Sequence, residues 1–168
     1  MQSNLITLKG VQDYYPDHFA QCYGCGRLNE FGYQLKTNWD GDETVSFFSS
    51  KHFQTAVPGF VYGGVLASII DCHGTGSAAL ALAREQGIEL AEFNAPRCVT
   101  ASLKVDYKKP TPIDIVLEIR GIIREVKGRK VVVEARLIAN GEICVTGEII
   151  AVQVSDDFGR PTDNLFGQ

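Results

Sequence analysis

The length, composition and charge of the chain indicate one domain and argue against two kinds of partner. With 168 residues, 45% of them hydrophobic, the chain can bury one core but is too short for two ordinary domains. A formal net charge of -4 and the lack of a Lys/Arg block argue against nucleic-acid binding. The first residues lack a secretory pattern, and no uninterrupted apolar run reaches membrane-spanning length. We therefore expect a cytoplasmic protein with no membrane partner.

The cysteines predict reduced thiols, because their number is odd and their spacing fits no disulfide framework. The five are Cys22, Cys25, Cys72, Cys98 and Cys144. Cys22 and Cys25 form a CxxC, which can supply half of a zinc site. No second CxxC or His pair completes four ligands, and no βαβ pattern suggests a redox motif. We expect no metal, and interpret the CxxC as a glycine-punctuated turn that leads into the first strand.

The first predicted elements are a hairpin and a long helix. Two short strand-like runs, residues 33–39 and 44–49, flank an Asp-Gly pair at 40–41, which is typical of a hairpin. Residues 65–83 are almost wholly apolar or small, and the chain enters them through Gly63-Gly64. This composition predicts a helix that is buried on most sides.

Four strands are predicted after a loop at residues 86–96. Residues 99–107 alternate and place five side chains on one face, namely Val99, Ala101, Leu103, Val105 and Tyr107. Further strands are predicted at 113–124, 130–139 and 143–154, with turns at Lys127-Gly128-Arg129 and Asn140-Gly141. The tight turns predict that strands three to six form an antiparallel meander.

This element order predicts an α+β fold in which a six-stranded antiparallel sheet wraps around one long buried helix. The expected organisation is an N-terminal segment at 1–32, the domain at 33–154 and a polar tail at 155–168. Such an open sheet has two edges, and exposed apolar edges favour aggregation unless they are paired. We therefore expect a homodimer that forms edge to edge about a two-fold axis, or a homotetramer built from two such dimers.

Asp71 is the leading candidate for function. It is the only formally charged residue between Lys51 and Arg84, and it lies inside the predicted buried helix. Burial of an unpaired carboxylate raises its pKa or costs several kcal/mol, which packing alone does not explain. Alternatively, Asp71 faces a water-filled seam or accepts backbone hydrogen bonds. His73 lies about 200° around the helix from Asp71, so we interpret it as a partly buried, hydrogen-bonded histidine rather than a catalytic partner.

Gly63 and Gly64 open the same helix, where backbone N–H groups have no intrahelical acceptor. Such a terminus can stabilise a carbonyl oxygen as it becomes an oxyanion, although Gly-Gly can also mark only a tight turn. Gly64 and Asp71 lie about 10 Å apart along one helix, too far for both to reach one thioester carbon. Two antiparallel helices across a dimer axis could combine Gly64 of one subunit with Asp71 of the other. We therefore expect the monomer to be inactive.

Three segments carry a family resemblance. They are residues 22–29 (CYGCGRLN), 58–71 (PGFVYGGVLASIID) and 100–110 (TASLKVDYKKP). Together they resemble the hotdog-fold acyl-CoA thioesterases, in particular the branch related to phenylacetate-pathway and human mitochondrial thioesterase-superfamily members. The resemblance covers roughly residues 22–154 and implies an acyl-CoA substrate, with no cofactor besides the CoA moiety of that substrate.

The resemblance also implies roles for particular residues. The Gly64 N–H would polarise the thioester carbonyl, and Asp71 would act as general base or as nucleophile. Thr100 would orient the water or the carboxylate, although it could be an ordinary strand residue. Candidates for binding the CoA phosphates are Lys108, Lys109 and Arg129, which could equally be solvated residues of a strand end and a turn.

One departure from the family pattern affects the site. Tyr62 stands where the family has histidine before the Gly-Gly pair. A phenol donates a hydrogen bond, but its pKa near 10 makes it a poor acid-base group at neutral pH. A noncatalytic acyl-CoA binding module is therefore one alternative to a thioesterase. Others are a hotdog hydratase or dehydratase, for which Asp71 lacks a matching histidine, and a structural dimerisation domain, which leaves Asp71 unexplained.

Overall fold

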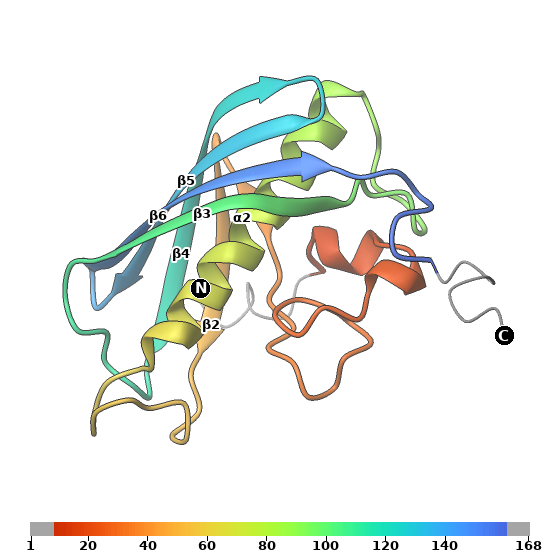
Figure 1. The fold of residues 1–168 in the computed structure, drawn as a ribbon. Helices are drawn as coiled ribbons and strands as arrows, with labels where there is room; N and C mark the ends of the chain where they lie inside the picture. The colour runs from red at the N-terminus through yellow and green to blue at the C-terminus, as the bar shows by residue number, and fades with distance from the viewer. Residues whose placement is uncertain (1–8, 161–168) are drawn as a thin grey trace, which may run out of the picture.

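A computed structural model describes residues 9–160; the first eight residues and the last part of the predicted tail lie outside this range (Figure 1). Two short 3-10 helices come first, η1 (Val11–Tyr14) and η2 (Asp17–Phe19). One long helix follows the first two strands. The elements after η2 are β1 (Asn38–Asp40), β2 (Glu43–Ser49), α2 (Gly63–Glu85), β3 (Cys98–Tyr107), β4 (Val116–Lys127), β5 (Lys130–Ala139) and β6 (Glu142–Gln153).

The six strands form one antiparallel sheet that curves around α2, as Figure 1 shows. The helix packs against every strand of the sheet. By length and composition α2 could also cross a bilayer, but 83% of its most apolar window is buried inside the protein, as expected of a core helix. The predicted arrangement of one buried helix and a six-stranded antiparallel sheet, which is the hotdog arrangement, is confirmed.

The predicted meander of strands three to six is wrong for β3. The strand order is β1-β2-β4-β5-β6-β3, so only β4, β5 and β6 form a meander. The segment between β3 and β4 does not form a hairpin, because it pairs with the loop before α2: Val61 N–H donates to Thr111 O at 2.9 Å, and Ile113 N–H donates to Gly59 O at 3.0 Å. This connection places β3 at the edge of the sheet, next to β6.

A bulge in β3 changes which side chains face the helix. The register with β6 shifts between Thr100 and Ser102, so Ala101 is an extra residue. Thr100 and Leu103 both pair with fully buried residues of β6, and both therefore face α2. The expectation that Val99 shares the face of Leu103 is therefore wrong. The bulge brings the Thr100 hydroxyl toward the helix.

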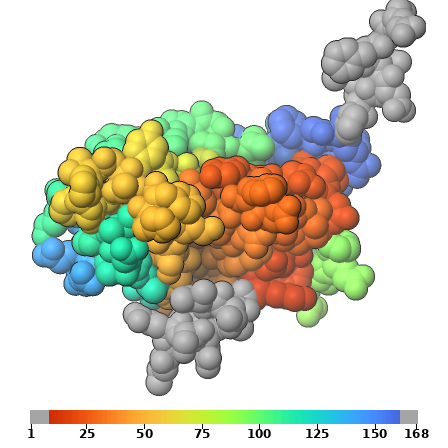
Figure 2. All heavy atoms as spheres, turned by 90° about the horizontal axis from the view of Figure 1, so that it is seen from below, coloured from red at the N-terminus to blue at the C-terminus, as the bar shows by residue number. Residues whose placement is uncertain are grey.

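The N-terminal segment belongs to the same core. Val11, Tyr15 and Ala20 are buried, and the segment packs on the middle of α2, where Gly24 approaches Cys72. Its outer side forms the red and orange surface in Figure 2. The backbone just after this segment pairs with it, since Leu35 N–H donates to Gly24 O at 3.0 Å. The first strand consequently begins at Asn38 instead of residue 33.

Candidate active site

The start of α2 presents backbone donors without acceptors. Tyr62 is the N-cap residue, and its side chain makes no capping hydrogen bond. The Tyr62 carbonyl accepts the N–H groups of Val65 and Leu66 at 3.0 and 3.3 Å. Within residues 9–160, no hydrogen bond uses the N–H of Gly63 or Gly64. These two groups, at the positive end of the helix dipole, are available to an anionic oxygen.

Two tyrosines surround this helix start. A Cβ atom at Gly64 would lie 2.4 Å from the Tyr62 ring, so the ring covers the backbone of Gly64 closely. The Tyr107 hydroxyl donates to the Gly63 carbonyl at 2.7 Å and ties the end of β3 to the helix. The Tyr62 side chain is 55% exposed, so its phenol can donate to a ligand at this position.

A groove of about 570 Å³ opens beside the helix start. Its apolar wall includes Val57, Phe60 and Leu66, and the segment after β3 adds Lys108 and Lys109. Pockets of this size and character suit small organic ligands. The groove therefore combines an apolar surface, two cations and the free N–H groups of α2.

The three predicted phosphate-binding residues do not lie together in one chain. Arg129 is in the turn between β4 and β5, where its carbonyl accepts the Gln153 N–H at 2.8 Å. Lys108 and Lys109 follow the opposite end of β3, and Lys109 pairs with Glu142 at 2.7 Å. The start of β5 pairs with Val152 of β6, and the end of β3 pairs with Val145 of the same strand. These two positions are seven residues, or about 23 Å, apart along β6. Within one protomer, Arg129 and the lysines therefore cannot contact the same phosphate.

Asp71 lies half-buried in α2 and contacts β3. Thr100 Oγ1 donates a hydrogen bond to Asp71 Oδ1, through the side chain that the bulge turns toward the helix. Burial raises the pKa of Asp71, and the hydrogen bond from Thr100 partly opposes this rise. A raised pKa makes a carboxylate a better base near neutral pH. The structure thus brings Asp71 and Thr100 together, as the resemblance implied.

Gly64 and Asp71 remain apart within one protomer, because both lie in the one helix α2. Seven residues of helix separate them by about 10 Å. The free N–H groups and the carboxylate therefore cannot act on the same carbon within a single chain.

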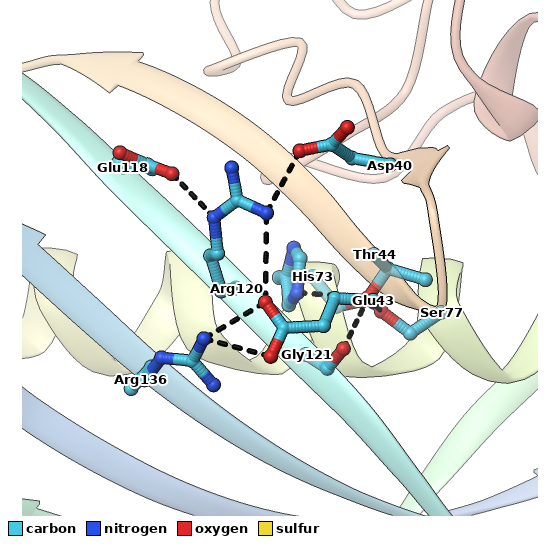
Figure 3. Close-up of polar contacts among 9 residues, drawn as sticks. All are labelled: Asp40, Glu43, Thr44, His73, Ser77, Glu118, Arg120, Gly121 and Arg136. Atoms are coloured by element: carbon cyan, nitrogen blue, oxygen red, sulfur yellow. Dashed lines mark hydrogen bonds and ion pairs between the residues drawn. The ribbon is translucent and has the colours of Figure 1, made fainter.

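His73 takes no part in this arrangement. Its Nδ1 lies 2.8 Å from the Ser46 hydroxyl and its Nε2 3.3 Å from the Thr44 hydroxyl. The ring is completely buried under β2 and β4 (Figure 3), and burial lowers its pKa to about 3. The sequence-based interpretation as a hydrogen-bonded histidine is confirmed, although burial is complete instead of partial. A Cβ at Gly121 would lie 2.7 Å from Nε2, which explains the glycine in β4.

Because His73 stays neutral in the folded protein, we expect the free energy of unfolding to depend on pH. The unfolded histidine takes up a proton below about pH 6.5, whereas the folded one does so only near pH 3. The free energy of unfolding should thus fall as pH drops through this window, by about 2 kcal/mol between pH 7 and pH 5. Urea unfolding of the wild type and of His73→Asn measures this slope. An undiminished slope in the variant would contradict the assignment to His73.

Sequence reasoning missed an ionic network on the outer face of the sheet. Glu43 accepts two hydrogen bonds of 2.8 Å from Arg136, and Arg120 Nη1 lies 2.8 Å from Asp40, as Figure 3 shows. Arg136 and Arg120 lower the pKa of Glu43. Because the network links side chains of β2, β4 and β5, its prediction requires knowledge of the strand order. It lies away from the helix start, and we assign it no role in the site.

A group of three thiols lies next to Asp71. Cys22 and Cys25 approach Cys72, which follows Asp71 in α2. This group is the one cluster within residues 9–160 whose geometry suits a metal ion. The expectation of no metal relied on the lack of further ligands near the CxxC in sequence, and Cys72 is distant in sequence but close in space.

Comparison with known proteins places the chain in a family. The model of the Thioesterase superfamily matches residues 58–146, which include Gly64, Asp71 and Thr100. Acyl-coenzyme A thioesterase THEM4 of Mus musculus is 30% identical over 131 residues, which are 78% of this chain and 51% of that protein. THEM4 of Xenopus laevis is 29% identical over 122 residues, covering 73% and 49%. The chain belongs to the thioesterase superfamily, and it spans about half the length of the curated relatives it matches.

Solved structures agree on the fold. A thioesterase superfamily protein from Shewanella loihica PV-4 is 49% identical, with a TM-score of 0.61 over 73% of this chain and 93% of that chain. A sigma28-regulated virulence protein from Campylobacter jejuni has a TM-score of 0.60 at 15% identity, over 87% and 97% of the two chains. At 15% identity the likeness shows the fold alone, because one fold can host many activities.

Proposed function

We propose that the chain hydrolyses an acyl-CoA thioester at a site composed of two protomers. The observation that carries this proposal is Asp71, a half-buried carboxylate that receives a hydrogen bond from Thr100 within a mostly buried helix. Packing does not require a carboxylate there, and its raised pKa suits a base. The thioesterase relatives support the choice of an acyl-CoA as substrate.

The reaction follows from two groups. Asp71 takes a proton from water as the water oxygen attacks the thioester carbon, and the carbonyl oxygen becomes an oxyanion. The Gly64 N–H donates to that oxyanion, with the helix dipole adding to the stabilisation. When the carbonyl re-forms, the C–S bond breaks, and the CoA thiolate takes the proton from Asp71. The products are a free acid and CoA.

The second protomer would dock on the free edge of β3. Ala101, Ser102, Leu103 and Lys104 are consecutive and all exposed, although they lie in a strand. Within the part of the chain that the structure describes, β6 is the only strand paired with β3, so its other edge is open. Antiparallel pairing of two β3 strands also sets the two α2 helices antiparallel. The start of one helix can then approach Asp71 of the other.

A panel of acyl-CoAs with short, long and aromatic acyl groups tests the proposal. Thiol release by the wild-type protein is followed while the oligomer mass is measured by light scattering. We expect turnover for at least one acyl class from a dimer or tetramer. A noncatalytic module, which Tyr62 in place of histidine favours, would instead bind these ligands without releasing thiol.

Replacement of Thr100 by valine should weaken catalysis and move its pH dependence. A hydrogen bond to a carboxylate contributes about 1.5 kcal/mol, and a transition state destabilised by that amount corresponds to about a tenfold lower kcat. Because this bond lowers the pKa of Asp71, its loss should shift the acidic limb of kcat/KM to higher pH. Thr100→Ser keeps the hydroxyl and should retain the wild-type profile. Identical pH profiles for the valine and serine variants would argue against the role of Thr100.

A further inference from the structure

The N-terminal segment brings two thiols against a third on α2. Cys22 and Cys25 lie in the loop after η2, whereas Cys72 lies in α2, after both strands of the first hairpin. Each offers a sulfur atom, and the three sulfurs all lie within 4.8 Å of one another. Cys22 Sγ and Cys72 Sγ are 3.7 Å apart. Cys22 and Cys25 fall outside residues 58–146, which match the family model.

This spacing corresponds to two ligands of a tetrahedral thiolate site. A Zn–S bond of about 2.3 Å and a tetrahedral angle place two sulfur ligands about 3.8 Å apart. The sulfurs of a disulfide, in contrast, are about 2.05 Å apart. The Cys22 and Cys72 sulfurs thus already stand at the separation that a shared ion requires.

The loop backbone is shaped to present Cys22 as a ligand. Gly26 N–H donates to the Cys22 carbonyl at 2.7 Å, which closes the turn. A Cβ at Gly24 would lie 2.3 Å from the Cys72 sulfur, so glycine is needed for the loop to approach the helix this closely.

A cation next to the cluster matches its charge. Three thiolates and one divalent ion carry a net charge of -1. The Arg97 guanidinium interacts electrostatically with Cys22 and Cys25 and lies 4.9 Å from the centre of the Tyr15 ring. Its Nη1 is buried and makes no hydrogen bond within residues 9–160. Arg97 can therefore neutralise an anionic metal-thiolate group.

We propose that Cys22, Cys25 and Cys72 bind one zinc-class divalent cation through three thiolates. A water molecule completes the tetrahedron on the side of Cys22, the one half-exposed thiol of the three. The ion fastens the N-terminal segment to α2, one residue from Asp71. This site is independent of the proposed hydrolysis, because its three ligands and its measurement do not involve a substrate.

Metal content and cobalt spectra test the site on the full chain. The wild-type protein, purified without chelators, should contain about one zinc per chain by elemental analysis, because the three thiolates form one site. Replacement of zinc by Co²⁺ should produce sulfur-to-cobalt charge-transfer bands and the strong visible bands of a tetrahedral ion. Because the spectrum is recorded on the wild type, it does not depend on any variant being able to fold.

Cysteine variants then identify the ligands. Cys22→Ser, Cys25→Ser and Cys72→Ser should each lower zinc affinity by about a hundredfold, since each removes one thiolate. Cys144→Ser, which changes a buried cysteine outside the cluster, should retain the wild-type zinc content. Circular dichroism checks that each variant is folded.

Three results would overturn the proposal. The first is wild-type protein that takes up neither zinc nor Co²⁺ under reducing conditions. The second is equal loss of zinc in the Cys144 variant and the three cluster variants. The third is a disulfide between Cys22 and Cys72 or Cys25 in protein alkylated under denaturing conditions without reductant, which would identify the cluster as a redox pair.

Discussion

Replacement of Asp71 by asparagine should lower kcat for acyl-CoA hydrolysis by about 10²–10⁴-fold, the contribution typical of a general base. The amide preserves the size of the side chain and can still accept the hydrogen bond from Thr100, but it cannot take a proton from water. Binding should persist, because the groove at the start of α2 is unchanged. Thiol release under saturating substrate and calorimetric titration with CoA measure the two quantities separately.

The stability of the same variant separates a functional role from a structural one. Burial raises the pKa of Asp71, so its carboxylate form destabilises the folded state at neutral pH. Asp71→Asn removes that penalty and should therefore melt at the wild-type temperature or above it, while activity is lost. Asp42→Asn, in the exposed turn between β1 and β2, serves as the control and should change neither property. Wild-type turnover in Asp71→Asn would refute the assignment.

Replacement of Gly64 by proline should lower kcat by about 10²–10³-fold, because proline removes a backbone donor to the oxyanion. Proline is tolerated in the first turn of a helix, and Gly64 is the second residue of α2, so the fold should persist. Gly64→Ala keeps the N–H and is the matched control. Its Cβ would meet the Tyr62 ring, which is exposed and can move aside. Equal activity of the proline and alanine variants would exclude this N–H as a donor.

The helix could be predicted, and its one buried carboxylate noticed, because both signals are local. A run of apolar and small residues with a single carboxylate identifies both α2 and Asp71 within one segment of sequence. The bounds of one strand were also predicted, since residues 130–139 match β5. Alternation of side chains and glycine turns are enough to place such elements.

The position of β3 was not predictable in this way, because strand pairing is a long-range property. Residues 108–115, which include two prolines, connect β3 to β4, but nothing in their sequence indicates that they pair with the loop before α2. The bulge at Ala101 has no clear sequence signature either, although it decides which side chains face the helix. Simple alternation places Thr100 on the face away from the helix, whereas its hydroxyl contacts Asp71 in α2.

The thiol cluster shows the same limit. Cys22 and Cys25 are recognisable as half of a site, but the third sulfur comes from the middle of α2. Spacing rules for metal sites require all ligands to lie in short sequence motifs, and Cys72 satisfies no such rule. Only the packing of residues 9–32 on the helix brings the three together.

Mixed oligomers of Asp71→Asn and Gly64→Pro test the two-protomer site most directly. If Gly64 and Asp71 act from different subunits, each mixed dimer contains one site with both wild-type residues and one site with neither. Random mixing makes half of the dimers mixed, so activity should return to about a quarter of the wild-type value, although each variant alone is inactive. Activity of the mixture no higher than the average of the two separate variants, with subunit exchange verified by native mass spectrometry, would contradict a site shared between protomers.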